Sequence, residues 1–149
     1  MFPSGHLALG YLLGKITKRI TGYNFNIILI WIFSILPDID VFIPFFYHRG
    51  PSHSLFAIVI FLIPVIFWFR RGLPYLASFS SHIIGDYFTF SGIQLFWPVN
   101  SNWIKANGPL LLDGQREIIL ELFLLLLMIF TLILSEDYKQ FSFKKSRVN

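Results

Sequence analysis

Residues 117–134 read EIILELFLLLLMIFTLIL, an almost unbroken apolar run near the end of a 149-residue chain. A helix that crosses a bilayer needs roughly 20 apolar residues, with about 17 as the lower bound. This segment meets that requirement, and Glu117 and Glu121 are its only charged side chains. We therefore predict a membrane helix here. Because only helices and closed barrels satisfy their backbone polar groups in lipid, we expect the other apolar segments to be helical too.

Four further apolar segments precede this run, and the second of them is interrupted by Pro37-Asp38-Ile39-Asp40. They lie at about Gly5–Gly14, Phe25–Tyr47, Ser54–Phe69 and Leu73–Phe90. The pattern predicts an all-α fold: a polytopic membrane bundle of about four to five helices, some short or broken, with at least three full spans. We assign residues 1–135 to this single domain and residues 136–149 to a basic cytoplasmic tail.

The composition excludes several classes of protein. Apolar residues make up 55% of the chain and charged residues 13%, against about 25% charged residues in an average soluble domain. The chain has no cysteine, which excludes disulfides, thiolate zinc sites and a cysteine nucleophile. The net charge of +4 comes from short basic clusters between apolar segments. This distribution is typical of membrane topology, and we expect no nucleic-acid partner.

The basic residues also predict an orientation. If the five segments alternate in direction, nine Lys and Arg residues lie at one end of the bundle, and only Arg49, Lys105 and Arg116 lie at the other. Basic loops stay in the cytoplasm, so we place the end with nine basic residues on the cytoplasmic side of the plasma (inner) membrane. We expect anionic lipid headgroups to contact the basic tail. The nine residues are Lys15, Lys18, Arg19, Arg70, Arg71, Lys139, Lys144, Lys145 and Arg147.

The same alternation brings all four histidines, and the acidic residues outside the tail except Glu121, to the extracytoplasmic end. Carboxylates gathered in one place repel one another, unless they protonate or a cation binds between them. Neighbouring imidazoles favour the cation, and a site with nitrogen and oxygen donors but no sulfur suits Zn²⁺, or alternatively Mn²⁺ or Fe²⁺.

Three sequence patterns supply candidate ligands. His82 and Asp86 are four residues apart, so a helix directs both to one face, and Gly85 between them permits close approach of another helix. Asp38 and Asp40 can serve the same site if the segment after Pro37 is extended or caps a helix.

The densest pattern is residues 48–54, HRGPSHS. His53 can ligate from the start of the third helix, with Ser52 as its N-cap. Arg49 offers a planar donor fork for an anionic substrate or product. Taken singly, His48, Glu117 and Asp113 are better explained as structural residues, but four histidines and three carboxylates in one layer together favour a metal site.

The order of these motifs resembles the YdjM-type family of membrane-bound proteins, which are regarded as metal-dependent hydrolases. The resemblance covers about Gly5 to Pro98. It implies a membrane-embedded fold and the metal ligands His6, Asp38, Asp40, His53, His82 and Asp86. The chain is also similar to the first half of zinc-dependent phospholipase C. No histidine follows His82, so we expect one or two ions rather than three. The motifs are Gly5-His6, residues 36–40 (LPDID), residues 48–54 (HRGPSHS), residues 81–86 (SHIIGD) and residues 95–98 (LFWP).

These features together predict a metal-dependent hydrolase, in the first place a phosphoesterase that acts on a lipid or lipid-linked phosphate through metal-activated water. We assign catalytic roles to Asp40, His48, Arg49 and Glu117. The alternative is a non-catalytic metal-binding or metal-transport membrane protein.

Overall fold

The computed structural model describes residues 1–45 and 47–141 and contains five α-helices. Across these residues there is no strand, and two isolated bridges, Thr89 with Leu112 and Ile93 with Ile104, join the loops. The all-α prediction is therefore confirmed. The helices are α1 (Pro3–Thr21), α2 (Ile27–Ile35), α3 (Leu55–Trp68), α4 (Leu73–Tyr87) and α5 (Gly114–Leu134).

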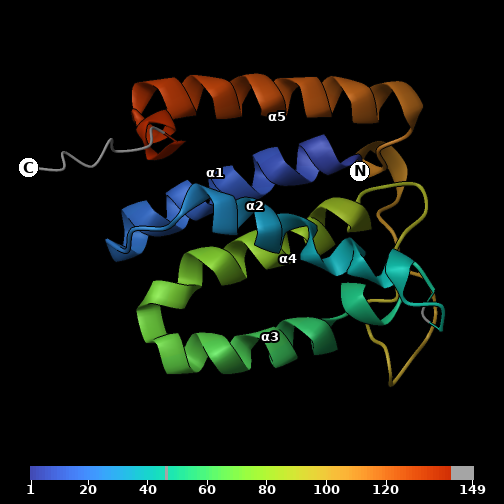
Figure 1. Ribbon diagram of the computed structural model, residues 1–149. Coiled ribbons are helices and arrows are strands. Elements are labelled where there is room, and N and C mark those ends of the chain that lie inside the picture. The colour runs from blue at the N-terminus through green and yellow to red at the C-terminus, as the bar shows by residue number, and fades with distance from the viewer. Residues whose placement is uncertain (46, 142–149) are drawn as a thin grey trace, which may run out of the picture.

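The helices lie side by side, from α5 through α1, α2 and α4 to α3 (Figure 1). Helix α1 packs against α2, α4 and α5, and α3 packs against α4. The start of α1, the end of α4 and the long loop that leads to α5 meet at one end of the bundle (Figure 1). The opposite end holds the α1–α2 and α3–α4 connections and the end of α5.

Helix α1 is longer than the Gly5–Gly14 segment that the hydropathy pattern predicts. It continues to Thr21 because Lys18 and Arg19 are good helix formers, and their positive charges are favourable in the last turn of a helix. Gly22 ends it in the left-handed conformation, with φ of 78°.

A small residue allows the close packing of α1, α2 and α4. A Cβ atom on Gly10 would lie 2.5 Å from the Cβ of Ser34 and 2.6 Å from the Oγ of Ser78. The Ser78 hydroxyl donates a hydrogen bond of 2.8 Å to the carbonyl of Ile30. These contacts fix α4, which carries His82 and Asp86, against α2, which leads into the segment that carries Asp38.

Helix α2 ends early because Pro37 cannot donate a backbone hydrogen bond and disfavours the α conformation for the residue before it. The chain continues as a 3₁₀-helix, η1 (Leu36–Phe42), and a second 3₁₀ turn, η2 (Pro51–His53), precedes α3. The prediction that Ser52 is the N-cap of the third helix is wrong. Ser54 caps α3 by accepting a hydrogen bond of 3.2 Å from the amide of Ala57.

Helix α5 presents an apolar surface to the outside. Across its described length, Glu121 and Leu124 are the buried residues. An exposed apolar face of this extent is what a lipid-facing helix requires. Among residues 1–45 and 47–141, α5 is the one helix long and apolar enough to cross a membrane, and α3 is apolar but has 14 residues.

The end opposite the candidate ligands carries basic residues, as predicted. Lys15 forms an ion pair of 2.8 Å with Asp137, which also accepts a hydrogen bond of 2.8 Å from the Tyr11 hydroxyl. Burial alone would raise the pKa of Asp137, but the contacts with Lys15 and Tyr11 outweigh it and lower that pKa. Asp137 begins a short 3₁₀-helix, Asp137–Phe141, in the first part of the expected tail. Lys144, Lys145 and Arg147 lie outside the described residues.

Candidate metal centre

Four side chains from three segments converge at the loop end of the bundle. Asp38 comes from η1, His53 from η2, and His82 and Asp86 from α4. Each offers one donor atom, and the four donor atoms lie within 4.8 Å of one another. His53, His82 and Asp86 are fully buried, whereas the Asp38 side chain is 29% exposed. The group is therefore accessible on the side of Asp38.

The spacing of these atoms suits a metal ion. Four ligands about 2.0–2.2 Å from a tetrahedral zinc ion lie about 3.3–3.6 Å from each other. The Nε2 atoms of His53 and His82 are 3.0 Å apart, and they lie 3.4 and 3.1 Å from Asp38 Oδ1. Asp86 Oδ2 lies 3.4 Å from the first nitrogen and 3.7 Å from the second. Two neutral imidazoles and two carboxylates in this arrangement fit a divalent cation.

Asp86 supplies an independent indication. Its Oδ2 atom is buried and has no hydrogen-bond partner among the described residues. A buried carboxylate oxygen without a hydrogen bond is costly in free energy. The Arg49 Nε atom, 3.1 Å away, offsets part of that cost through its charge, and a coordinated cation would remove more of it. The donor set and this atom together show that the residues fit a metal ion.

Contacts at Nδ1 orient the rings of His53 and His82 so that each Nε2 atom points toward the other donor atoms of the group. The Nδ1 of His82 donates a hydrogen bond of 2.6 Å to the carbonyl of Ser34, which is free because α2 ends one residue later. The Nδ1 of His53 lies 2.9 Å from Ser52 Oγ, which in turn donates to Asp40 Oδ2 at 2.5 Å. Protonation at Nδ1 leaves the lone pair on Nε2, as metal-ligating histidines require.

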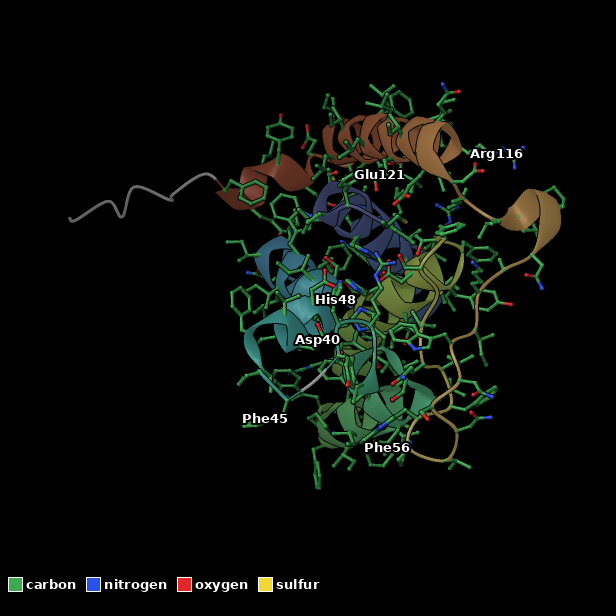
Figure 2. All side chains as sticks on the ribbon, turned by 90° about the vertical axis from the view of Figure 1, so that its right-hand side faces the viewer. Asp40, Phe45, His48, Phe56, Arg116 and Glu121 are labelled. Carbon is green, nitrogen blue, oxygen red and sulfur yellow. The ribbon has the colours of Figure 1, made fainter. Side chains whose placement is uncertain are left out.

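Asp40, a predicted ligand, lies outside the group of four. Residues two apart on a 3₁₀-helix point about 120° from each other, so η1 directs Asp38 toward the group and Asp40 behind His53. Asp40 Oδ2 is 3.3 Å from His53 Nδ1 and accepts the backbone N–H of Arg49 at 3.0 Å. Figure 2 shows Asp40 and His48 near the middle of this end of the bundle. The position of Asp40 is that of a residue that orients a ligand.

His6, another predicted ligand, lies beside the group. Its ring stacks on that of His82 with a centroid distance of 3.6 Å, and its Nε2 is 3.2 Å from Asp86 Oδ1. Both nitrogens of His6 are buried without a hydrogen-bond partner in the described part of the chain. A Cβ on Gly85 would lie 3.5 Å from the His6 ring, an ordinary van der Waals distance, but 3.1 Å from the Met1 sulfur, so the glycine makes room for Met1 rather than for His6. His6 and Asp86 Oδ1 together offer only two donors for a second ion.

The carboxylates control the charge of His53. Burial alone would lower the pKa of His53, but hydrogen bonds with Asp38, Asp40 and Asp86 outweigh it and raise the pKa to about 10. Burial would raise the pKa of Asp40, but His53, His48 and Ser52 lower it to about 2. The group thus requires positive charge between its carboxylates, which a proton on His53 or a cation can supply.

Arg49 and His48 lie at the edge of the centre. Arg49 Nε is 3.1 Å from Asp86 Oδ2, and its Nη1 donates a hydrogen bond of 2.7 Å to Thr89 Oγ1. The backbone of Arg49 has a φ of 66°, a strained conformation that proteins tend to keep at functional sites. His48 Nδ1 donates a hydrogen bond of 2.9 Å to Asp40 Oδ1. With Ser91 and Trp103, both residues line a cavity of about 460 Å³.

Glu117 and Glu121 face the start of α1. Glu117 Oε1 lies 3.2 Å from the Met1 amino group, which is 2.9 Å from Asp86 Oδ1. Glu121 accepts hydrogen bonds from the Phe2 amide at 2.5 Å and the Ser4 hydroxyl at 3.1 Å. Figure 2 shows Glu121 between α5 and α1. Glu117 is therefore not a member of the group of four, although it lies one contact away from Asp86.

Sequence reasoning missed three contributors to the centre. These are the Ser34 carbonyl, the Ser52 hydroxyl and Thr89, which orient His82, His53 and Arg49 respectively. The adjacency of Ser52 to His53 was the one available signal. No sequence pattern identifies which backbone carbonyl a distant histidine contacts.

Comparison with known proteins gives one result. A family model described as the YdjM inner membrane protein matches residues 1–138. No curated protein and no solved structure matches the chain.

Proposed function

The chain belongs to the YdjM family of inner membrane proteins, and from this membership and the metal centre we propose that it is a membrane-bound, metal-dependent hydrolase. The single observation that carries the proposal is the set of Asp38, His53, His82 and Asp86 donor atoms at the spacing of metal ligands. Zn²⁺ suits this donor set best, with Mn²⁺ and Fe²⁺ as alternatives.

Asp38, His53, His82 and Asp86 would hold the ion. When bound, a divalent ion at this position supplies Lewis acidity and lowers the pKa of a coordinated water to about 7. The substrate would approach from the side of Asp38, the one exposed ligand. Zinc can expand from four to five ligands during a reaction, so four protein ligands are compatible with catalysis.

The neighbouring residues favour a phosphate ester as the substrate. The guanidinium of Arg49 lines the cavity beside the centre and suits an anionic group. Asp40 holds the Nδ1–H of His48, which leaves His48 Nε2 able to take up or release a proton. This carboxylate–histidine pair could transfer a proton to the leaving group, the role of a general acid.

The proposed topology is polytopic, with the metal centre at the extracytoplasmic face. Basic residues at the opposite end support this sidedness. The centre then lies at the depth of the lipid headgroups, and a lipid or lipid-linked phosphate is the substrate that reaches it most easily.

A second function, non-catalytic metal binding, is favoured by one observation. Four protein ligands are the number typical of structural zinc sites, whereas catalytic sites commonly use three. Metal transport is less well supported, since the buried Glu121 is satisfied by Phe2 and Ser4 rather than lining a route through the bundle.

Phosphate release by detergent-purified protein distinguishes these functions. We expect the protein loaded with Zn²⁺ or Mn²⁺ to release phosphate from phosphatidic acid, and His82→Ala to abolish the release. Asp137→Asn, which removes a buried carboxylate at the far end, is the matched control and should retain activity. Stoichiometric metal without hydrolysis of any phosphate ester would leave the binding function in place of the enzyme.

A further inference from the structure

An apolar groove lies between η1 and α3, beside the metal centre. Its volume is about 490 Å³, and its lining includes Leu36, Ile39, Phe56, Ile60, Phe79 and Trp97. On α3 the lining residues are 56, 57, 60, 61 and 64, which share one helix face and extend about 12 Å along the axis. Asp40 and Ser52 are the polar residues of this groove, and both contact His53.

A second apolar groove lies against η1 and the start of α1. Its volume is about 340 Å³, and it is lined by Pro3 of α1, by Ile32 and Ile35 of α2, and by residues 36, 38, 39 and 42 of η1. Asp38, the exposed metal ligand, is its polar residue. The two grooves share Leu36 and Ile39, so they flank η1, and each reaches one of its two carboxylates.

The polar end of each groove is linked to Arg49 by side-chain contacts. Asp38, in the smaller groove, lies 3.4 Å from His53 Nε2, which lies 3.4 Å from the Asp86 oxygen that Arg49 contacts. Asp40 lines the larger groove and binds His48, which lines the cavity with Arg49. An occupant with two hydrocarbon chains and one phosphate would thus find apolar surface on both sides of η1. Its phosphate would find the positively charged guanidinium of Arg49 beside the metal ligands. Ile60 and Ile32, on the walls, are 51% and 46% exposed, so both grooves open toward the surroundings of the bundle.

We infer that the protein binds a diacyl phospholipid astride η1, with one acyl chain in each groove and the phosphate at the Arg49 cavity. The inference rests on the proposed function for the placement of the phosphate. A membrane phospholipid is the occupant because the chain belongs to an inner membrane family and the grooves are apolar except at the carboxylate ends. Binding pockets for such ligands are mostly apolar with a few polar groups that fix orientation.

Photolabelling tests the inference without requiring catalysis. The probe is phosphatidic acid with a terminal diazirine on the sn-1 chain, or, in a second preparation, on the sn-2 chain. After irradiation of the detergent-purified protein, mass spectrometry should find adducts of one probe on groove residues of α3. Adducts of the other probe should lie on groove residues of α2, with unlabelled phosphatidic acid competing for both.

Two variants block the grooves separately. Ile60→Trp should reduce labelling of the larger groove about tenfold, because denying about two methylene groups to an apolar site already weakens binding that much. Ile32→Trp should do the same for the smaller groove. The matched controls are Ile63→Trp on α3 and Ile28→Trp on α2, which are 53% and 52% exposed and line neither groove. Both control variants should be labelled on the groove residues to the same extent as the wild type.

The outcomes separate this inference from the proposed function. Specific labelling of both grooves without phosphate release would support the lipid site and contradict the hydrolase. Hydrolysis of a water-soluble phosphate ester, with adducts spread evenly over the apolar faces of α2, α3 and α5, would support the hydrolase and overturn the lipid site. Labelling of one groove by both probes would overturn the two-chain arrangement.

Discussion

Asp40 and Asp86 are both carboxylates beside His53, but the structure gives them different roles. Asp86 Oδ2 is one of the four donor atoms, whereas Asp40 reaches the group through His53 Nδ1 and Ser52. Replacement by Asn keeps the size of each side chain and removes its charge. We expect both variants to weaken metal binding, with the larger effect at Asp86.

The two magnitudes follow from the two positions. Residues that orient a ligand typically contribute 10–100-fold in metal affinity, or about 1.4–2.7 kcal/mol. Asp40→Asn belongs in this range because its amide oxygen can still accept from Ser52. Structural zinc sites have apparent binding free energies of about 10–16 kcal/mol, which over four ligands gives about 2.5–4 kcal/mol each. Asp86→Asn should therefore lose roughly 100- to 1000-fold.

Competition with a chromophoric chelator measures these ratios in detergent-purified protein, and elemental analysis checks the stoichiometry. Asp137→Asn is the control, because it removes a buried carboxylate that contacts Tyr11 and Lys15 instead. Equal losses from Asp40→Asn and Asp86→Asn would show that Asp40 is a ligand, as the sequence suggested, and would refute the assigned geometry. Unchanged affinity in both would refute the metal centre itself.

Three further predictions concern the substrate, pH and packing. Arg49→Lys should raise KM for phosphate esters about tenfold with metal content unchanged, because a lysine lacks the planar fork; steady-state kinetics and elemental analysis check this. The lowered pKa of Asp137 means that its contacts, about 2 kcal/mol for a charged hydrogen bond, stabilise the fold above pH 4 and are lost as pH falls below it. The Tm difference between the wild type and Asp137→Asn should thus shrink from pH 6 to pH 3. Gly10→Ala should destabilise the bundle by about 1–3 kcal/mol, since its Cβ would clash with Ser34 and Ser78, and chemical denaturation measures this loss.

The sequence predicted much of the fold because hydropathy alone marks apolar helices. It also brought the histidines to one end, since apolar segments that alternate in direction place every second connection, with its polar residues, at the same end of the bundle. The i, i+4 spacing of His82 and Asp86 correctly placed both on one helix face. The length of α1 escaped prediction because basic residues end a hydropathy segment without ending a helix.

The donor atoms could not be predicted, because they depend on local backbone geometry. Residues 36–42 carry two aspartates that a linear sequence presents as equivalent. The 3₁₀ conformation separates them, and hydropathy does not distinguish it from an α-helix or an extended segment. The N-cap of α3 was misplaced by two residues for a similar reason, since Ser52 and Ser54 both suit that position by residue type.

Pro37 connects the fold to the chemistry, and its replacement tests that connection. By ending α2 it frees the Ser34 carbonyl for His82, and it begins the 3₁₀ turn that directs Asp38 and Asp40 apart. In Pro37→Ala the α-helix can continue, so the Ser34 carbonyl would bond within the helix and Asp38 would rotate out of the group. We expect metal affinity to fall at least about tenfold, the cost of a lost orienting contact, although Pro37 donates no ligand. Pro64→Ala, within α3, is the control and should bind metal as the wild type does. Wild-type affinity in Pro37→Ala would show that the centre does not depend on the early end of α2.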